Sequence, residues 1–213
     1  MSTVAQAQGE GPAAPGADPH AIVQPWWLRL FHWINVVAVL ALIFSGWRIY
    51  DASPIFDFRF PHDITLGGWL GGALLWHFAA MWLLFANGLA YLLCNLATGR
   101  LQARFFPLHP RDVIADFLAA LRGHLAHDDL RRYNAVQKLA YLGAIVLLLV
   151  LVLSGLAIGK SVQLAFLREL MGGYDNARIV HFFAMAGLVF FIVVHVVMVA
   201  LVPKTLLVMI RGR

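Results

Sequence analysis

The sequence of 213 residues contains a single cysteine, Cys94, and few charged residues. One cysteine excludes an intrachain disulfide and any zinc or iron–sulfur site that requires several thiolates. The motif Cys-x-x-Cys-His is also missing, which excludes covalent attachment of a c-type haem. Charged residues make up 13% of the chain, whereas a soluble domain carries about 25%. A soluble globular protein is therefore a poor description of this chain.

Apolar residues dominate the composition instead. They make up 61% of the chain, and the mean hydropathy is +0.76. Both values predict an integral membrane protein embedded in a lipid bilayer. In such a protein, the net charge of +5 reports on membrane topology and does not indicate nucleic-acid binding.

The first 25 residues differ from the rest of the chain. They are rich in Ala, Gly, Pro and Gln and show no periodicity, which predicts a disordered tail. The tail lacks the positive start and short apolar core of a signal peptide. We therefore predict a disordered cytoplasmic tail at 1–25 and a single membrane domain at 26–213.

Four long apolar stretches in that domain predict an all-α membrane protein, a bundle of four transmembrane helices. The predicted helices cover about 27–50, 66–96, 135–159 and 176–202. Within the connection 97–135, the apolar residues between Pro110 and Leu125 recur at helical spacing. This spacing predicts an amphipathic helix on the membrane surface.

The distribution of Lys and Arg predicts the orientation of the bundle. With the N-terminus in the cytoplasm, 11 of the 16 Lys and Arg residues fall on the cytoplasmic side. Because cytoplasmic segments carry the excess of positive charge, both termini are predicted to be cytoplasmic. The expected location is the bacterial inner membrane, as a multi-pass protein.

The stretch from Asn176 to Pro203 carries two histidines, His181 and His195, 14 residues apart. On a helix they fall on nearly the same face and about 21 Å apart along the axis. A histidine inside a bilayer is costly and by default marks a functional site. The alternative is that both are simply hydrogen-bonded to neighbouring helices.

Two further histidines, His32 and His77, lie in the first and second predicted helices. The topology places His32 near the cytoplasmic surface, as it does His195. It places His77 in the outer half of the bilayer, as it does His181. We therefore predict that His32 pairs with His195 and that His77 pairs with His181.

Each predicted pair could supply the two axial ligands of a non-covalent b haem. Zinc is the rival cofactor, but it requires four protein or water ligands, usually with Cys or carboxylate among them. The small residues Ser45-Gly46 at the end of the first helix would admit a neighbouring helix or a flat ligand. The glycines at 67, 68, 71 and 72 could serve helix packing or clear space for a planar ring.

Haem propionates need cationic partners, and three arginines are candidates. Arg29 lies near the cytoplasmic pair, and Arg48 and Arg178 lie near the outer pair. Topological bias or contact with lipid headgroups explains each of them equally well.

A six-coordinate haem has no open position for a substrate, so the expected activity is electron transfer, with no catalytic residue. Transfer across a bilayer requires a lipid-soluble carrier, for which quinone is the candidate. Asn134 and Gln137, at the cytoplasmic end of the third helix, could bind a quinone carbonyl. Alternatively, Asn134 caps that helix.

These residues resemble a known family, the four-helix di-haem cytochromes b of the bacterial cytochrome b561 group. The resemblance rests on Arg29-x-x-His32-Trp33, His77, the segment Tyr-Asn-Ala-x-Gln-Lys at 133–138, and the pair His181 and His195. It covers about residues 26–213. Members serve nickel-iron hydrogenases, formate dehydrogenase N and thiosulfate reductase-type enzymes.

The resemblance implies two b haems. His32 and His195 would ligate the haem on the cytoplasmic side, and His77 and His181 the haem on the periplasmic side. It also implies a quinone site that includes Asn134, with Gln137 as a further candidate. The expected partner is a periplasmic oxidoreductase of the molybdopterin or hydrogenase type, and the sequence is compatible with a homo-oligomer.

Two other functions fit the sequence. One is a free-standing di-haem oxidoreductase that oxidises superoxide or another small donor and reduces quinone. It would need a cationic funnel on the outer face, where five basic and five acidic residues are mixed. The other is a haem-free transporter or proton relay.

Overall fold

The computed structural model describes residues 24–99 and 135–212, together with Arg111, Ile114 and Leu118. Most of the predicted tail, most of the predicted surface helix and Asn134 lie outside these residues. Arg111, Ile114 and Leu118 are helical.

Four long helices dominate the described chain. Each is long and apolar enough to cross a membrane, so the predicted all-α membrane fold is confirmed. They are α1 (Trp26–Ala52), α2 (Leu70–Ala97), α5 (Ala135–Gly159) and α7 (Tyr174–Leu201).

The outer faces of these helices expose large apolar side chains. Leu75, Trp82 and Phe190 have exposed fractions of 74%, 64% and 71%. Exposed apolar patches of this extent are rare in soluble monomers. These faces therefore contact the acyl chains of the bilayer in a multi-pass membrane protein.

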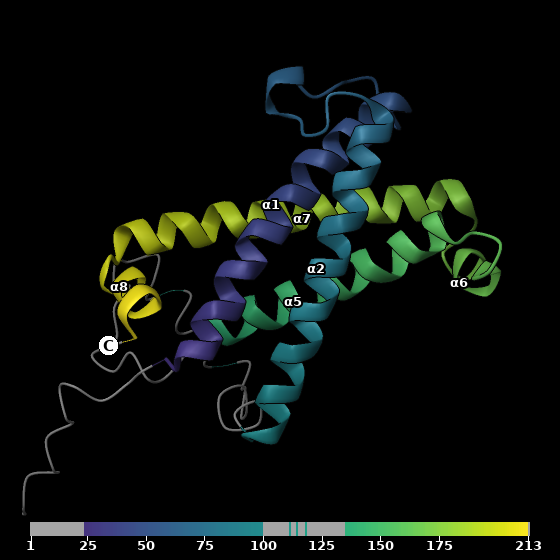
Figure 1. Ribbon diagram of the computed structural model, residues 1–213. Helices are drawn as coiled ribbons and strands as arrows, with labels where there is room; N and C mark the ends of the chain where they lie inside the picture. Colours follow the sequence, from purple (N-terminus) through teal and green to yellow (C-terminus); the bar gives the residue numbers. More distant parts are fainter. Residues whose placement is uncertain (1–23, 100–110, 112–113, 115–117, 119–134, 213) are drawn as a thin grey trace, which may run out of the picture.

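The helices form two hairpins, α1 with α2 and α5 with α7. In Figure 1 the first hairpin crosses the second, and the backbone contacts are concentrated within each hairpin. Side chains provide much of the contact between the hairpins. Near one end, the ring of Tyr50 on α1 lies 5.2 Å from that of Phe182 on α7.

Helix α2 begins at Leu70, four residues later than predicted. Gly67 and Gly68 adopt φ angles of 108° and 71°, in the left-handed region that a right-handed helix excludes. The prediction that the helix starts at residue 66 was wrong because these two glycines form a turn before it.

The next two glycines leave room for a side chain of the protein itself. A Cβ atom on Gly71 would lie 2.3 Å from the indole ring of Trp69, and one on Gly72 would lie 2.2 Å from the carbonyl oxygen of Gly67. The planar ring beside these glycines is thus the indole of Trp69, and no space for a cofactor is needed to explain them.

Three short helices complete the described chain: η1 (His62–Ile64), α6 (Ala165–Leu170) and α8 (Lys204–Arg211). Helix α8 contacts the start of α1, because Trp33 Nε1 donates to the carbonyl of Met209 at 3.3 Å. The beginning of α1 and the end of α8 therefore lie at the same end of the molecule (Figure 1).

A buried amide joins α1 to α2 in the apolar interior. The Asn87 side chain is 6% exposed. Its Nδ2 donates to the Phe31 carbonyl at 2.8 Å and to Asn35 Oδ1 at 2.7 Å. Hydrogen bonds of this kind hold membrane helices together where the hydrophobic effect does not.

We expect Asn87→Ala to lower the free energy of unfolding by about 1 kcal/mol, because both inter-helix hydrogen bonds are lost. For a chain of this size, the melting temperature in detergent should fall by roughly 2–4 °C. Asn95→Ala is the control, since the buried Asn95 amide donates to Tyr91 of its own helix. An equal decrease in the two variants would contradict the proposed role of Asn87.

Candidate functional site

The structure brings the four intramembrane histidines together in two pairs. The ring centres of His77 on α2 and His181 on α7 are 6.4 Å apart. Those of His32 on α1 and His195 on α7 are 6.2 Å apart. Helix α7 contributes to both pairs, and its partners come from both helices of the other hairpin.

The separation within each pair suits a metal ion held between two imidazoles. An iron atom about 2.0 Å from one nitrogen of each ring would place the ring centres roughly 6 Å apart. Within the described residues, no group of three or more His, Cys, Asp or Glu side chains could hold a metal ion. Two imidazoles alone are too few for zinc, whereas haem supplies the other four ligands itself.

Both members of the His77–His181 pair contact a buried serine. Ser45 Oγ on α1 lies 3.0 Å from His77 Nδ1, and Ser154 Oγ on α5 lies 2.8 Å from His181 Nδ1. Both serines have an exposed fraction of 0%. In each hairpin, a serine on the first helix thus contacts a histidine on the second.

The glycine after each serine gives the imidazole its space. A Cβ atom on Gly46 would lie 3.5 Å from His77 Cε1, and one on Gly155 would lie 3.4 Å from His181 Cε1. These are ordinary van der Waals distances, so any side chain longer than alanine would enter the space of the ring. The predicted close approach at Ser45-Gly46 is thus made by the imidazole of His77.

The surroundings of the His32–His195 pair are aromatic. Trp33 lies edge-on to His32, with 5.4 Å between ring centres. Phe191 stacks on His195 with 5.9 Å between centres and 16° between planes. In the part of the chain that the structure describes, neither imidazole has a hydrogen-bond partner.

Comparison with known proteins identifies the family. Residues 23–212 match the family model for prokaryotic cytochrome b561. This chain belongs to the prokaryotic cytochrome b561 family. A relative from Azospira oryzae is 62% identical over 190 residues, which cover 89% of this cytochrome and 96% of the relative. Its name is "Putative protein-methionine-sulfoxide reductase subunit YedZ1". No solved structure matches the chain.

Membership of this family implies membrane electron transfer and b-type haem. The two imidazole pairs are the groups in the described part of the cytochrome that fit such a cofactor. Neutral imidazole is a common axial ligand of haem iron, and the apolar helices around the pairs exclude water from it.

Two of the three predicted propionate partners are engaged elsewhere in the cytochrome. Arg29 Nη1 donates to the Ile210 carbonyl at 2.6 Å and so joins α1 to α8. Arg178 donates to the Ser53 carbonyl and, at 3.3 Å, to Ser53 Oγ, and so joins α7 to the end of α1. Each therefore has a structural role that neither topological bias nor lipid contact describes.

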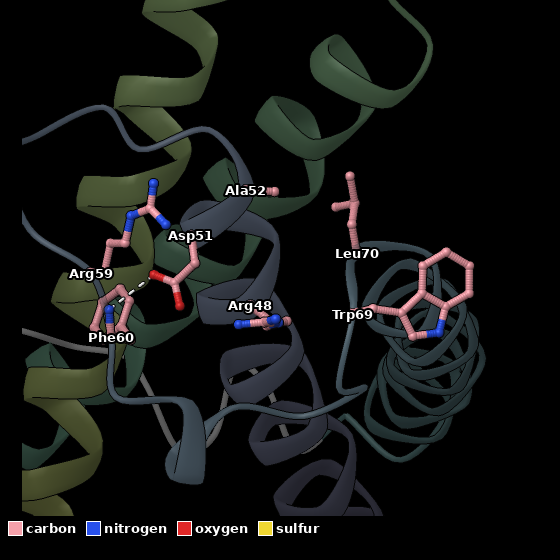
Figure 2. A pocket seen from close by; sticks show the side chains of 7 residues that line it. All are labelled: Arg48, Asp51, Ala52, Arg59, Phe60, Trp69 and Leu70. Atoms are coloured by element: carbon pink, nitrogen blue, oxygen red, sulfur yellow. Dashed lines mark hydrogen bonds between the residues drawn. The ribbon is translucent and has the colours of Figure 1, made fainter.

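The third candidate, Arg48, lines a cavity of about 410 Å³ where α1 ends. Figure 2 shows Arg48 and Asp51 on α1, with Arg59 and Phe60 on the loop that follows. The Phe60 amide donates to Asp51 Oδ1 at 2.9 Å and holds this loop in place. Trp69 and Leu70, from the start of α2, complete the lining.

The predicted quinone-binding residues lie at the opposite end of the cytochrome. Gln137 is in the first turn of α5, and Asn134 lies outside the described residues. Because α5 and α7 run antiparallel, the Ser154–His181 contact sets their register. Counting 14 residues from that contact on each helix brings residue 140 level with His195, so Gln137 lies about one turn beyond that histidine.

Sequence reasoning missed Ser154 and Gly155 as parts of the site. A signal was present, because Ser-Gly occurs only twice in the chain, at 45–46 and 154–155. Both occurrences fall near the same end of a predicted helix. Without the tertiary structure, however, the dipeptide alone reads as a helix-packing element.

Proposed function

We propose that this cytochrome transfers electrons from quinol to a periplasmic oxidoreductase through two b haems. One haem would be held by His32 and His195, the other by His77 and His181. The observation that carries the proposal is the presence of two imidazole pairs, each with the ring separation that an iron atom requires. They lie at two depths, about 21 Å apart along α7.

Haem would supply a one-electron redox centre at each pair. The chain's own residues fix its position: the imidazoles occupy both axial positions, and the apolar helices exclude water. With both positions taken by histidine, no coordination site is left for a substrate. The chemistry of substrate conversion is therefore assigned to a separate partner subunit.

The relative's name suggests the nature of that partner. If this cytochrome also serves a methionine-sulfoxide reductase, the partner reduces a sulfoxide to a thioether and water, which consumes two electrons and two protons. Oxidation of one quinol to quinone releases two electrons and two protons, so the two half-reactions balance. The partner would bind at the end of the bundle that carries the His77–His181 pair.

The direction of transfer across the membrane follows from the predicted topology. With both termini in the cytoplasm, the His32–His195 pair lies on the cytoplasmic side of the inner membrane. The quinone site would include Asn134 and Gln137. Its support is the register of α5 and α7, which places Gln137 one turn beyond His195.

Arg48 is the proposed partner of the propionates at the His77–His181 pair. It lies two residues after Gly46, which is next to the His77 ring. Arg59 lines the same cavity and would provide a second positive charge.

The alternative of a free-standing superoxide oxidase gains no support from the outer surface. Arg168 pairs with Glu169 at 2.7 Å, and Arg178 lies 3.8 Å from Asp175. Carboxylates thus offset these two arginines, and an anion would meet no strongly cationic funnel there.

Purified protein should test the proposal directly. We expect two haems b per chain, two steps in a redox titration, and reduction of both haems by a quinol analogue. Asn134→Leu and Gln137→Leu should each slow reduction by quinol roughly tenfold or more while both haems are retained. Protein without a b-type absorption band would overturn the proposal, as would reduction by superoxide but not by quinol.

The partner is tested by reconstitution with the oxidoreductase encoded beside it. Reoxidation of the quinol-reduced cytochrome on addition of methionine sulfoxide, with one sulfoxide reduced per two electrons, is the expected result. Reoxidation by protons with release of hydrogen would instead indicate a hydrogenase partner and would overturn the assignment.

A further inference from the structure

The two buried serines beside the His77–His181 pair have no role in the function proposed so far. Ser45 Oγ lies 2.5 Å from the Ala41 carbonyl oxygen, and Ser154 Oγ lies 2.6 Å from the Val150 carbonyl oxygen. Each hydroxyl therefore hydrogen-bonds backwards along its own helix as well as contacting a histidine.

These contacts determine where the protons lie. A serine hydroxyl has one proton, and a carbonyl oxygen has none to give. The hydroxyl proton must therefore point at the carbonyl, and the Oγ can only accept a hydrogen bond from the ring. Nδ1 of His77 and of His181 then carries the proton, and Nε2 keeps the lone pair that can bind iron.

The same hydrogen bond affects the electronic properties of the ligand. When a ligating imidazole donates its second N–H to an acceptor, its orientation is fixed and its basicity rises. A more basic ligand stabilises the oxidised iron more than the reduced iron. The His32–His195 pair lacks such a partner within the described residues, so the serines distinguish one centre from the other.

We infer that Ser45 and Ser154 are positioning residues that fix the Nδ1–H tautomer and the orientation of His77 and His181. Through these imidazoles they lower the reduction potential of the centre that the pair holds. The inference rests on the proposed function, since it requires iron between the two rings.

The test uses the purified full-length cytochrome with Ser45→Ala, Ser154→Ala and the double substitution. Ser161→Ala is the matched control, because the Ser161 hydroxyl also hydrogen-bonds backwards along α5, to the Ala157 carbonyl at 3.2 Å, but is not hydrogen-bonded to a histidine. Haem content, a redox titration and the low-spin electron paramagnetic resonance spectrum are measured for each protein.

We expect each single substitution to shift one of the two midpoint potentials upward. The ratio of reduced to oxidised haem at the wild-type midpoint should rise about threefold for that centre alone. The resonance of the same haem should move, because its imidazole can rotate. The double variant should show a larger shift, and Ser161→Ala should show none.

A Ser154→Thr variant adds a rescue, because a helical threonine hydroxyl can hydrogen-bond to the same backbone carbonyl. Its potential should return toward that of the wild type. Two intact haems with unchanged potentials and spectra in the alanine variants would overturn the inference alone. A wild-type protein that lacks two haems would overturn the proposed function instead.

Discussion

Replacing His181 with alanine is expected to remove one of the two haems and leave the other intact. The haem content should fall to about half, because a centre that loses one of its two axial imidazoles no longer holds b haem tightly. His77→Ala should give the same loss, since the two rings face each other at 6.4 Å. The measurements are the haem-to-protein ratio and the resonance that disappears.

The pairing makes a sharper statement about double variants. His77→Ala with His181→Ala should still retain one haem, whereas His181→Ala with His195→Ala should retain none. His62→Ala is the control, because His62 lies in η1, is exposed, and should leave both haems in place. A His181→Ala protein with both haems would falsify the pairing.

Gly155→Val is expected to have an effect nearly as large at the same centre. A Cβ atom at this position already reaches 3.4 Å from His181 Cε1, and the two methyl groups of valine would extend into the ring. Overpacking of this kind costs about 1–3 kcal/mol or displaces the side chain. A displaced imidazole would lose both its serine contact and its alignment with His77.

The expected result is loss of most of the haem held by His77 and His181, with the other haem retained. Gly155→Ala should keep both haems, because its Cβ makes only ordinary contact. Gly143→Val is the matched control on the same helix, since a Cβ there meets nothing within 4 Å and the residue is exposed. Equal haem loss in Gly143→Val and Gly155→Val would show that the effect comes from helix propensity.

The cavity beside Arg48 and the two short contacts of Arg29 and Arg178 show why charge is hard to interpret from sequence. All three arginines lie near a membrane surface and near a histidine in the linear order. The structure ties two of them to backbone carbonyls of other helices, and only Arg48 lines a cavity. An arginine side chain is long enough to reach several partners, so only the packing of the helices decides among them.

Much of this protein could be read from its sequence, because the relevant signals are local or follow from one constraint, the bilayer. Apolar runs of spanning length predicted the four helices, since a membrane leaves the backbone few other ways to satisfy its hydrogen bonds. The bilayer also gives every residue a depth. Depth was enough to sort four histidines into two pairs that the structure brings together.

The tertiary structure decided what depth and periodicity leave open. Depth orders residues along the membrane normal but does not say which side chains meet at one level. The contacts of Ser45 and Ser154 with His77 and His181 depend on the rotation and register of each hairpin, which the sum of many weak packing interactions sets. The sequence therefore determined which residues could hold haem, and the packing of α1 on α2 and α5 on α7 decided which neighbours orient them.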